Sequence, residues 1–159
     1  MKLLITGGYG FIGSNFINLV SEMGHTVLNI DNVTYAANRN NIKMKPNIKN
    51  VEIDIVDYNL LEKTMLDFQP DAIIHFAAES HVDNSIENPY VFLNTNIFGT
   101  YNLLQASSKL DNNFHYIHIS TDEVFGELGE EGFFTEETSY DPKSPYSASK
   151  ASSDHLVRA

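Results

Sequence analysis

Tyr146 and Lys150 are spaced so that they could perform proton chemistry. They stand four residues apart, in the stretch SPYSASK, where Ser144 can cap a helix and Pro145 suits its first position. Because residues i and i+4 share a helix face, the ammonium of Lys150 lies near the phenol of Tyr146. A nearby cation and a positive helix end both favour phenolate, so we expect the pKa of Tyr146 to fall from about 10. The pair predicts a base that removes the hydroxyl proton of an alcohol as hydride leaves the same carbon.

Thr121, Asp122 and Glu123 form a second chemical cluster, in STDEVFG at the end of an apolar run. Two adjacent carboxylates can be pushed to different pKa values, one remaining protonated as an acid and the other ionised as a base. That division of roles suits the elimination of water from a carbon skeleton. Taken alone, such a pair after a strand is more often a solvated turn. Beside Tyr146 and Lys150, we interpret it as catalytic.

Gly7, Gly10 and Gly13 follow a short apolar run and open a helix-like segment, in TGGYGFIG. Glycines at this spacing let the backbone approach a pyrophosphate, which sits on the helix N-terminus. The alternative is a tight turn that binds nothing. Asp31, about 20 residues further on, favours a ligand because its carboxylate can accept hydrogen bonds from both ribose hydroxyls. It would repel a 2′-phosphate, so NAD is expected rather than NADP.

Asp54 follows a third apolar run and is placed to meet the adenine amino group, with Ile55 beside the ring. Alone, Asp54 would be a routine loop carboxylate. Together with the glycine motif and Asp31, it indicates a dinucleotide site.

The elements that must position these residues alternate along the chain. Apolar runs at 2–6, 26–30, 51–53, 71–76 and 115–120 predict strands, and residues 11–22, 59–68, 90–109 and 145 onward predict helices. Such alternation implies right-handed βαβ units. We expect an α/β fold of the Rossmann type, a doubly wound parallel sheet in three layers with strand order 3-2-1-4-5. Residues 38–50 and the acidic stretch 126–144 are expected to be loops, the second near the active site.

Composition narrows the function classes. The 159 residues contain 10 Lys and Arg against 21 Asp and Glu, for a formal net charge of −11, and no Cys. This charge argues against a nucleic-acid binder, whose affinity rests on basic side chains. No segment suggests a signal peptide, a membrane span or a metal site, so we expect a cytoplasmic protein without a resident metal.

Five stretches together resemble one enzyme family. TGGYGFIG, AAESHVDNSI, TNIFGTYNLLQA, ISTDEVFGEL and SPYSASKASSDHLVRA are similar to segments of the nucleotide-sugar 4,6-dehydratases of the extended short-chain dehydrogenase/reductase superfamily. The resemblance spans essentially the whole chain, and the members acting on dTDP-glucose match best. The carboxylate pair separates dehydratases from the related 4-epimerases.

The resemblance implies residue roles and a reaction. The family's NAD-binding positions correspond to Gly7, Gly10, Phe11, Ile12, Gly13, Asp31, Asn32, Val33, Thr34, Asp54, Ile55, Phe76, Ala77, Ala78, Glu79, Ser80, Thr95, Tyr146 and Lys150, and Ser80 and Thr121 would also touch the glucosyl group. By similarity, Tyr146 takes the 4-OH proton while hydride passes from C4 to NAD⁺. Glu123 then removes the C5 proton, Asp122 protonates the departing 6-OH, and NADH returns hydride to C6. This lyase reaction yields dTDP-4-keto-6-deoxyglucose, a step of deoxysugar biosynthesis, without net redox change.

Some alternatives stay open at this point. Asn84 stands where dTDP-glucose dehydratases commonly carry Arg, and HVDNS looks more like the UDP-glucose dehydratases, so UDP-glucose is the second expected substrate. A 4-epimerase and a catalytically silent NAD-binding module are further alternatives. Family members continue past position 159 with a smaller substrate domain. We therefore expect residues 1–159 to be a truncated NAD-binding domain that lacks a complete substrate site, and the full-length form to be a homodimer.

Overall fold

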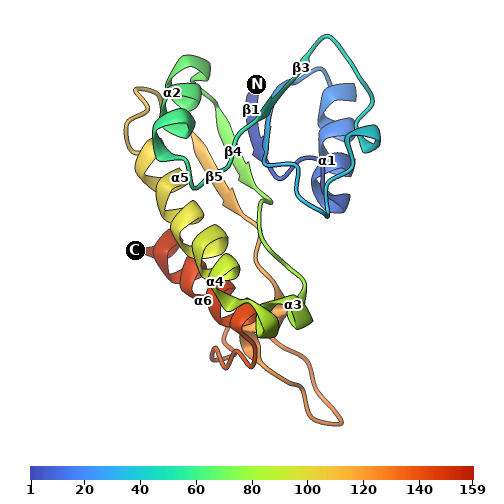
Figure 1. The fold of residues 1–159 in the computed structure, drawn as a ribbon, viewed down its shortest axis with the longest axis vertical. Coiled ribbons are helices and arrows are strands. Elements are labelled where there is room, and N and C mark those ends of the chain that lie inside the picture. Colours follow the sequence, from blue (N-terminus) through green and yellow to red (C-terminus); the bar gives the residue numbers. More distant parts are fainter. The chain divides into compact units, whose positions relative to one another are not determined.

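The computed structural model describes all residues from 1 to 159, in two compact units (Figure 1). Unit 1 contains Met1–Ala77 and Asn102–Ile119. Unit 2 contains Ala78–Tyr101 and Ser120–Ala159. The two are described separately.

Unit 1 is built on a five-stranded sheet. Its strands are β1 (Lys2–Thr6), β2 (Thr26–Asp31), β3 (Ile48–Glu52), β4 (Ala72–His75) and β5 (His115–His118). All neighbouring pairs are parallel, in the order β3-β2-β1-β4-β5. The predicted fold class and strand order are confirmed.

The central strands are buried on both faces, as a parallel sheet requires. Successive residues Leu4 and Ile5 of β1 have no exposed surface, yet they point to opposite sides of the sheet. Ile5 packs in a cluster with Ile17 of helix α1 (Phe11–Glu22). Leu4 packs in another with Leu61 of helix α2 (Tyr58–Phe68). Helices therefore cover both faces, which gives unit 1 the three layers expected from the sequence.

Unit 2 consists of helices and irregular segments. It contains α3 (Val82–Glu87), α4 (Pro89–Phe92), the π-helical segment η2 (Leu93–Gly99), the 3-10 turn η3 (Asp122–Phe125) and α6 (Pro145–Arg158). Helix α5 (Thr100–Ser107) begins in unit 2 and ends in unit 1, which also holds the 3-10 turn η1 (Arg39–Asn41). None of the helices combines the length and the apolar character needed to cross a membrane.

Two predicted elements had wrong boundaries, and one helix was not predicted. Strand β3 begins at Ile48 rather than at residue 51, because Ile48 pairs with Val27 and is buried although Lys49 and Asn50 beside it are polar. As an edge strand, β3 tolerates such residues. The helix expected over 90–109 contains the π-helical segment and ends at Ser107, and helix α3 at Val82–Glu87 was not anticipated.

Candidate functional site

The glycine loop of unit 1, Gly7 to Gly13, packs closely against neighbouring backbone at its first and third glycines. Gly7 has φ +72°, and a Cβ there would lie 2.6 Å from the backbone nitrogen of Ala77. A Cβ on Gly13 would lie 2.4 Å from the carbonyl oxygen of Gly7. At Gly10, by contrast, the nearest atom to an added Cβ is 3.3 Å away. The first and third glycines thus serve close packing, while the middle one lies at the more open side of the loop.

The N-terminus of α1 follows directly from this loop. Its N-cap is Gly10, which has no side chain that could cap the helix. The next two residues, Phe11 and Ile12, are 80% and 61% exposed. The first N–H groups of a helix have no intrahelical acceptor, and the helix dipole is positive there. This end of α1 therefore suits a phosphate, as the sequence predicted for a pyrophosphate.

Asn29 supports the glycine loop and was not identified from the sequence. It is fully buried in β2, where its side-chain oxygen accepts from Gly8 N at 3.0 Å and its amide donates to Asn50 Oδ1 at 3.0 Å. The available signal was an amide within the otherwise apolar stretch TVLNI. A buried amide requires partners, and here they are the loop and the neighbouring strand.

Asp31 is held in place by two backbone groups. One carboxylate oxygen accepts from Tyr9 N and the other from Val33 N, both at 2.8 Å. Each oxygen retains a further lone pair for a ligand hydroxyl. Val33 has φ +53°, a conformation that costs a β-branched residue of order 1–3 kcal/mol and that is common at ligand sites.

Most of the remaining predicted cofactor residues of unit 1 already have hydrogen-bond or packing partners within the protein. Asp54 accepts from Asn32 Nδ2 at 2.8 Å and from Val56 N at 2.9 Å. Thr34 O accepts from Ala37 N in a turn. Ile55 is 4% exposed and packs in the core, Phe76 contacts the ring of Phe16, and Ala77 N donates to Thr6 Oγ1 at 3.3 Å.

In unit 2, Asn96 connects the segment after β4 with helix α6. Its side chain accepts from Glu79 N at 2.8 Å, donates to Glu79 O at 2.9 Å and donates to Ser149 Oγ at 2.8 Å. Ser149 in turn donates to Tyr146 O. Asn96 is 2% exposed and lies in the π-helical segment, a geometry frequent at functional sites. Ala78, Glu79 and Thr95 are half-buried, and Ser80 is exposed.

Thr121 organises the carboxylate pair. It caps the turn η3, where its hydroxyl accepts from Glu123 N at 3.3 Å, and it also lies 3.5 Å from Asp122 Oδ1. Asp122 and Glu123 are both exposed. Two carboxylates are therefore presented to solvent from one short turn.

Helix α6 begins as the sequence predicted. Ser144 and Ser147 form a capping box with Pro145 in the first turn, and this fixes the position of Tyr146. Tyr146 is 8% exposed, with its ring 6.3 Å from that of Phe92, and Lys150 is 4% exposed. Both predicted catalytic groups of α6 are thus buried.

The expected fall in the pKa of Tyr146 was wrong for this structure. Burial raises the pKa of this phenol, and the charges of Glu123 and Asp122 raise it further, because each disfavours phenolate. A hydrogen bond with Thr121 acts in the opposite direction. Burial also lowers the pKa of Lys150 to about 8, against the charge of Asp154. Desolvation of the phenol has the largest effect on its pKa, and a sequence does not reveal it directly.

Asp154 is a second residue that sequence reasoning missed. This carboxylate is 7% exposed and accepts from Ser120 Oγ at 2.6 Å and from Tyr140 OH at 2.9 Å. It stands four residues after Lys150, on the same face of α6. That spacing was the signal in the sequence. Asp154 thus ties the segments before Thr121 and before Ser144 to the helix that carries Tyr146 and Lys150.

The predicted site residues divide between the two units. Gly7 through Ala77 belong to unit 1, and Ala78, Glu79, Ser80 and Thr95 belong to unit 2 with all five predicted catalytic residues. Within unit 2, Thr121, Asp122 and Glu123 all act on the pKa of Tyr146, so that these four residues form one cluster.

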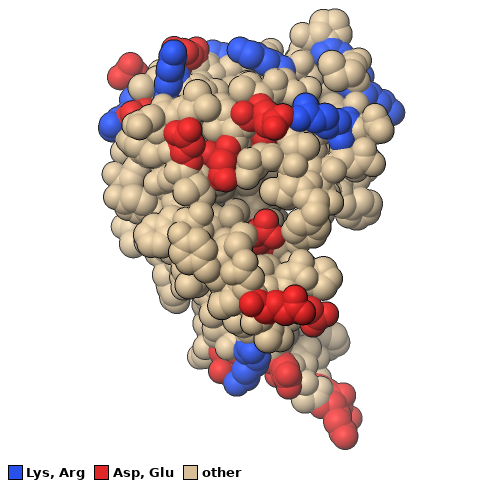
Figure 2. Space-filling model, viewed as in Figure 1, with Lys and Arg blue, Asp and Glu red and all other residues tan.

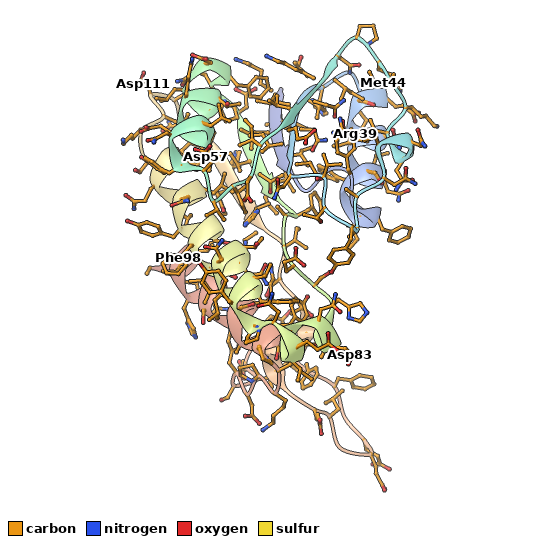
Figure 3. The ribbon with its side chains drawn as sticks, viewed as in Figure 1. Arg39, Met44, Asp57, Asp83, Phe98 and Asp111 are labelled. Atoms are coloured by element: carbon orange, nitrogen blue, oxygen red, sulfur yellow. The ribbon has the colours of Figure 1, made fainter.

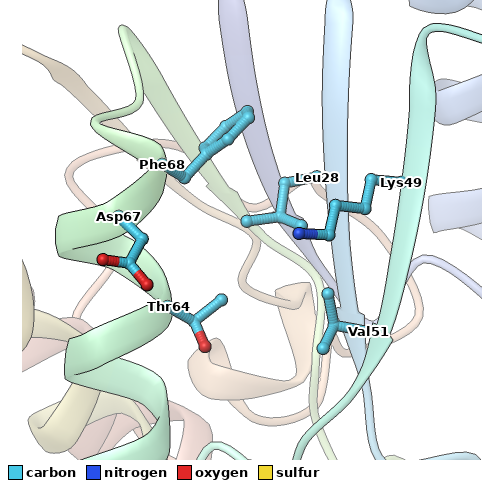
Figure 4. Close-up of a pocket in the computed structure, with 6 residues that line it drawn as sticks. All are labelled: Leu28, Lys49, Val51, Thr64, Asp67 and Phe68. Atoms are coloured by element: carbon cyan, nitrogen blue, oxygen red, sulfur yellow. The ribbon is translucent and has the colours of Figure 1, made fainter.

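A pocket in unit 1 contains none of the predicted site residues. It is lined by Leu28, Lys49, Val51, Thr64, Asp67 and Phe68, from β2, β3 and α2 (Figure 4). No group of three or more His, Cys, Asp or Glu side chains is arranged to hold a metal ion. On the face drawn in Figure 2, most basic side chains lie in the upper part of the view beside acidic ones, and the lower part carries mainly acidic side chains.

Comparison with known proteins identifies the family. The family model described as GDP-mannose 4,6 dehydratase matches residues 4–159. The chain belongs to this family. The resemblance to nucleotide-sugar 4,6-dehydratases, inferred from the five sequence stretches, is thereby confirmed.

Individual proteins and solved structures are also similar to this chain. A dTDP-glucose 4,6-dehydratase of Xanthomonas campestris pv. campestris (strain B100) is 49% identical over 98% of this chain and 48% of its own length. DesIV, a dTDP-glucose 4,6-dehydratase from Streptomyces venezuelae with NAD and TYD bound, matches with a TM-score of 0.92 and 42% identity over 99% of this chain and 51% of its own. A UDP-glucose 4-epimerase from Thermus thermophilus, in complex with NAD, matches with a TM-score of 0.90 and 30% identity over 99% and 50%. The chain spans about half the length of the curated relatives that it matches.

Proposed function

We propose that residues 1–159 form the NAD-binding domain of a nucleotide-sugar 4,6-dehydratase that acts on dTDP-glucose. The observation that carries the proposal is the cluster of Thr121, Asp122, Glu123 and Tyr146 in unit 2. It combines a hydroxyl, two exposed carboxylates and a phenol, which are the groups that oxidation of an alcohol followed by loss of water requires. Similarity to dTDP-glucose 4,6-dehydratases supports this substrate.

The residues of unit 1 suit NAD. In the glycine loop, Gly7 and Gly13 pack against neighbouring backbone, whereas Gly10 has more open space around it. The N-terminus of α1 lacks a side-chain cap and so has free N–H groups for a phosphate. The carboxylate of Asp31 can accept further hydrogen bonds from ribose hydroxyls. Asp54, Asn32 and Val33 would line the adenosine, while Ser80, Thr95, Tyr146 and Lys150 would serve the nicotinamide half and Ser80 and Thr121 the sugar. Held by these residues, NAD⁺ would supply the reversible hydride acceptor that oxidation at C4 and reduction at C6 of the sugar require.

The protein's own residues move the protons. Tyr146 takes the proton of the 4-OH, and the charge of Lys150 favours the phenolate that this step needs. Once C4 is a ketone, the C5 proton is acidic, and Glu123 removes it. Asp122 protonates the departing 6-OH, which leaves as water. Burial and the charges of Glu123 and Asp122 raise the pKa of Tyr146, so a cation near the phenol would favour the ionised base.

Exposed aromatic side chains of unit 2 bear on how the full-length protein assembles. Tyr90, Phe98 and Tyr101, from α4 through the start of α5 in unit 2, are 70%, 59% and 46% exposed, and Phe98 is labelled in Figure 3. Exposed aromatic residues on a helical surface are typical of interfaces. We propose a homodimer for the full-length form, in the cytoplasm. Sedimentation of the full-length protein tests the first statement, and cell fractionation tests the second.

A 4-epimerase is the second candidate, because a UDP-glucose 4-epimerase matches the chain with a TM-score of 0.90. An epimerase only oxidises and reduces at C4, so it has no use for the carboxylates of Asp122 and Glu123. These two residues therefore favour the dehydratase.

Proton NMR of the sugar distinguishes the candidates. The full-length protein and residues 1–159 alone would be incubated with NAD⁺ and either dTDP-glucose or UDP-glucose. We expect a new 6-methyl doublet with a 4-keto signal from the full-length protein, faster with dTDP-glucose. A galactose-configured product would assign an epimerase instead, and no conversion of either sugar would contradict both.

A further inference from the structure

An ion pair lies beside Asp31 at the end of β2. Arg39 of the turn η1 pairs with Glu52, the last residue of β3, and Glu52 is the register partner of Asp31 in the parallel sheet. Arg39 is labelled in Figure 3. Two carboxylates and one guanidinium therefore meet at the edge of the sheet where the ribose of a dinucleotide is expected.

Arg39 is also attached to the glycine loop. Its guanidinium carbon lies 5.5 Å from the ring centroid of Tyr9, and Asn38 N donates to Tyr9 O at 3.0 Å. Tyr9 N is the same group that donates to Asp31 Oδ2. Glu52, Tyr9 and Asp31 all raise the pKa of Arg39, the hydrogen bond with Glu52 having the largest effect. Arg39 thus contacts the same residue, Tyr9, that donates to Asp31, and it interacts electrostatically with the Asp31 carboxylate.

The arrangement bears on the choice between NAD and NADP. A 2′-phosphate adds nearly two negative charges at the ribose, which Asp31 repels, whereas an arginine there accepts them with two parallel hydrogen bonds. Arg39 offers such a group, but Glu52 already occupies it. We propose that the Arg39–Glu52 pair is a second determinant of cofactor choice beside Asp31. Glu52 engages the guanidinium next to Asp31 and so withholds it from a 2′-phosphate.

A purely structural role is the competing explanation. The side chains of Arg39 and Glu52 are 56% and 60% exposed, and ion pairs at such positions contribute little to stability. Removing either charge should therefore leave the fold intact, and an effect on cofactor binding can be measured separately.

Calorimetric titration of the full chain with NAD⁺ and with NADP⁺ tests the inference, which rests on the proposed binding of NAD. In Glu52→Gln, we expect the affinity for NADP⁺ relative to NAD⁺ to rise by about tenfold, the value of one released charge-assisted hydrogen bond. In Asp31→Asn/Glu52→Gln, the relative affinity should rise further. Adding Arg39→Gln to that double variant should abolish the gain.

A matched control and the contrary outcomes complete the experiment. Lys43→Gln removes a cation from the same loop, where Lys43 pairs with Glu22 of α1, and should not change the ratio. If the triple variant keeps the gain in NADP⁺ affinity, or if Glu52→Gln leaves the ratio unchanged while NAD⁺ binds, Arg39 has no such role and the proposed function still stands. If the unmodified chain binds neither dinucleotide, both proposals are wrong. Should the changes at Asp31 unfold the chain, Glu52→Gln and Arg39→Gln alone decide, since their side chains are exposed.

Discussion

The two units hold their interiors together by different means. The interior of unit 1 contains two apolar clusters on either side of the sheet, with side chains such as Ile5, Leu28 and Leu61 fully or almost fully buried, beside a few buried polar side chains such as Asn29. The buried face of α6 in unit 2 includes Ser147, Ser149, Ser153 and Asp154 instead. Apolar packing stabilises the folded chain. Buried polar networks fix a specific geometry, but any polar group in them that loses its partner costs stability. The difference suggests that unit 1 is a scaffold and that unit 2 holds groups in place for chemistry.

Tyr146→Phe tests this contrast most strongly. The substitution keeps the ring beside Phe92 and removes only the phenolic oxygen. We expect the rate of the proposed dehydration to fall by about 10²–10⁴-fold, the contribution of a positioned general base, with little change in unfolding free energy. The NMR assay and urea denaturation measure the two quantities. Tyr101→Phe, on an exposed tyrosine, is the control and should be active. An active Tyr146→Phe would remove Tyr146 from the mechanism.

Leu61→Ala examines the scaffold. Leu61 is fully buried in the cluster beneath α2, so its truncation leaves a cavity and should lower the unfolding free energy by about 2–5 kcal/mol. Leu60→Ala, at a neighbouring position that is 44% exposed, should change it by less than about 0.5 kcal/mol. Urea denaturation compares the two. Equal effects would mean that this cluster does not stabilise unit 1.

Lys150 should make stability depend on pH. Its pKa is lowered from 10.5 to about 8 by burial, so below pH 8 the folded and unfolded chains both carry the proton and the full cost of burying the charge is present. As the pH rises from about 8 to 10.5, the folded chain has lost the proton while the unfolded chain retains it, and stability increases. Between pH 7 and 10, wild type should gain about 2–3 kcal/mol relative to Lys150→Met. Parallel stability curves for the two proteins would contradict the burial of a charged lysine.

Asn96→Ala has a smaller expected effect on stability than Leu61→Ala. It removes the hydrogen bonds of the Asn96 side chain to both backbone groups of Glu79 and to the Ser149 hydroxyl. Because Ser149 still donates to Tyr146 O and Glu79 is half-buried, we expect the cost of about one unpartnered polar group, about 1–3 kcal/mol. We expect a loss of about 1–3 kcal/mol in urea denaturation, with Asn94→Ala of the same segment as the control. A loss no larger than that of the control would show that the network around Asn96 is dispensable.

The sequence predicted unit 1 better than unit 2, for a physical reason. Apolar periodicity reports burial, and burial is what forms the strands and helices around Leu4 and Ile5, so strand order and the glycine loop could be inferred. Periodicity says little about polar interiors. The π-helical segment around Asn96 and the role of Asp154 depend on particular hydrogen bonds that no repeat in the sequence encodes. The pKa of Tyr146 was predicted in the wrong direction because helix geometry is visible in a sequence and desolvation is not.

The amide pair of Asn29 and Asn50 has a consequence for how the sheet assembles. These side chains meet because Asn29 and Asn50 are register partners in β2 and β3. If β3 slipped by one residue, the side chain of Asn50 would point to the other face, and the fully buried amide of Asn29 would lose its acceptor. The pair therefore selects one alignment of β3, an edge strand whose other residues include the charged Lys49 and Glu52.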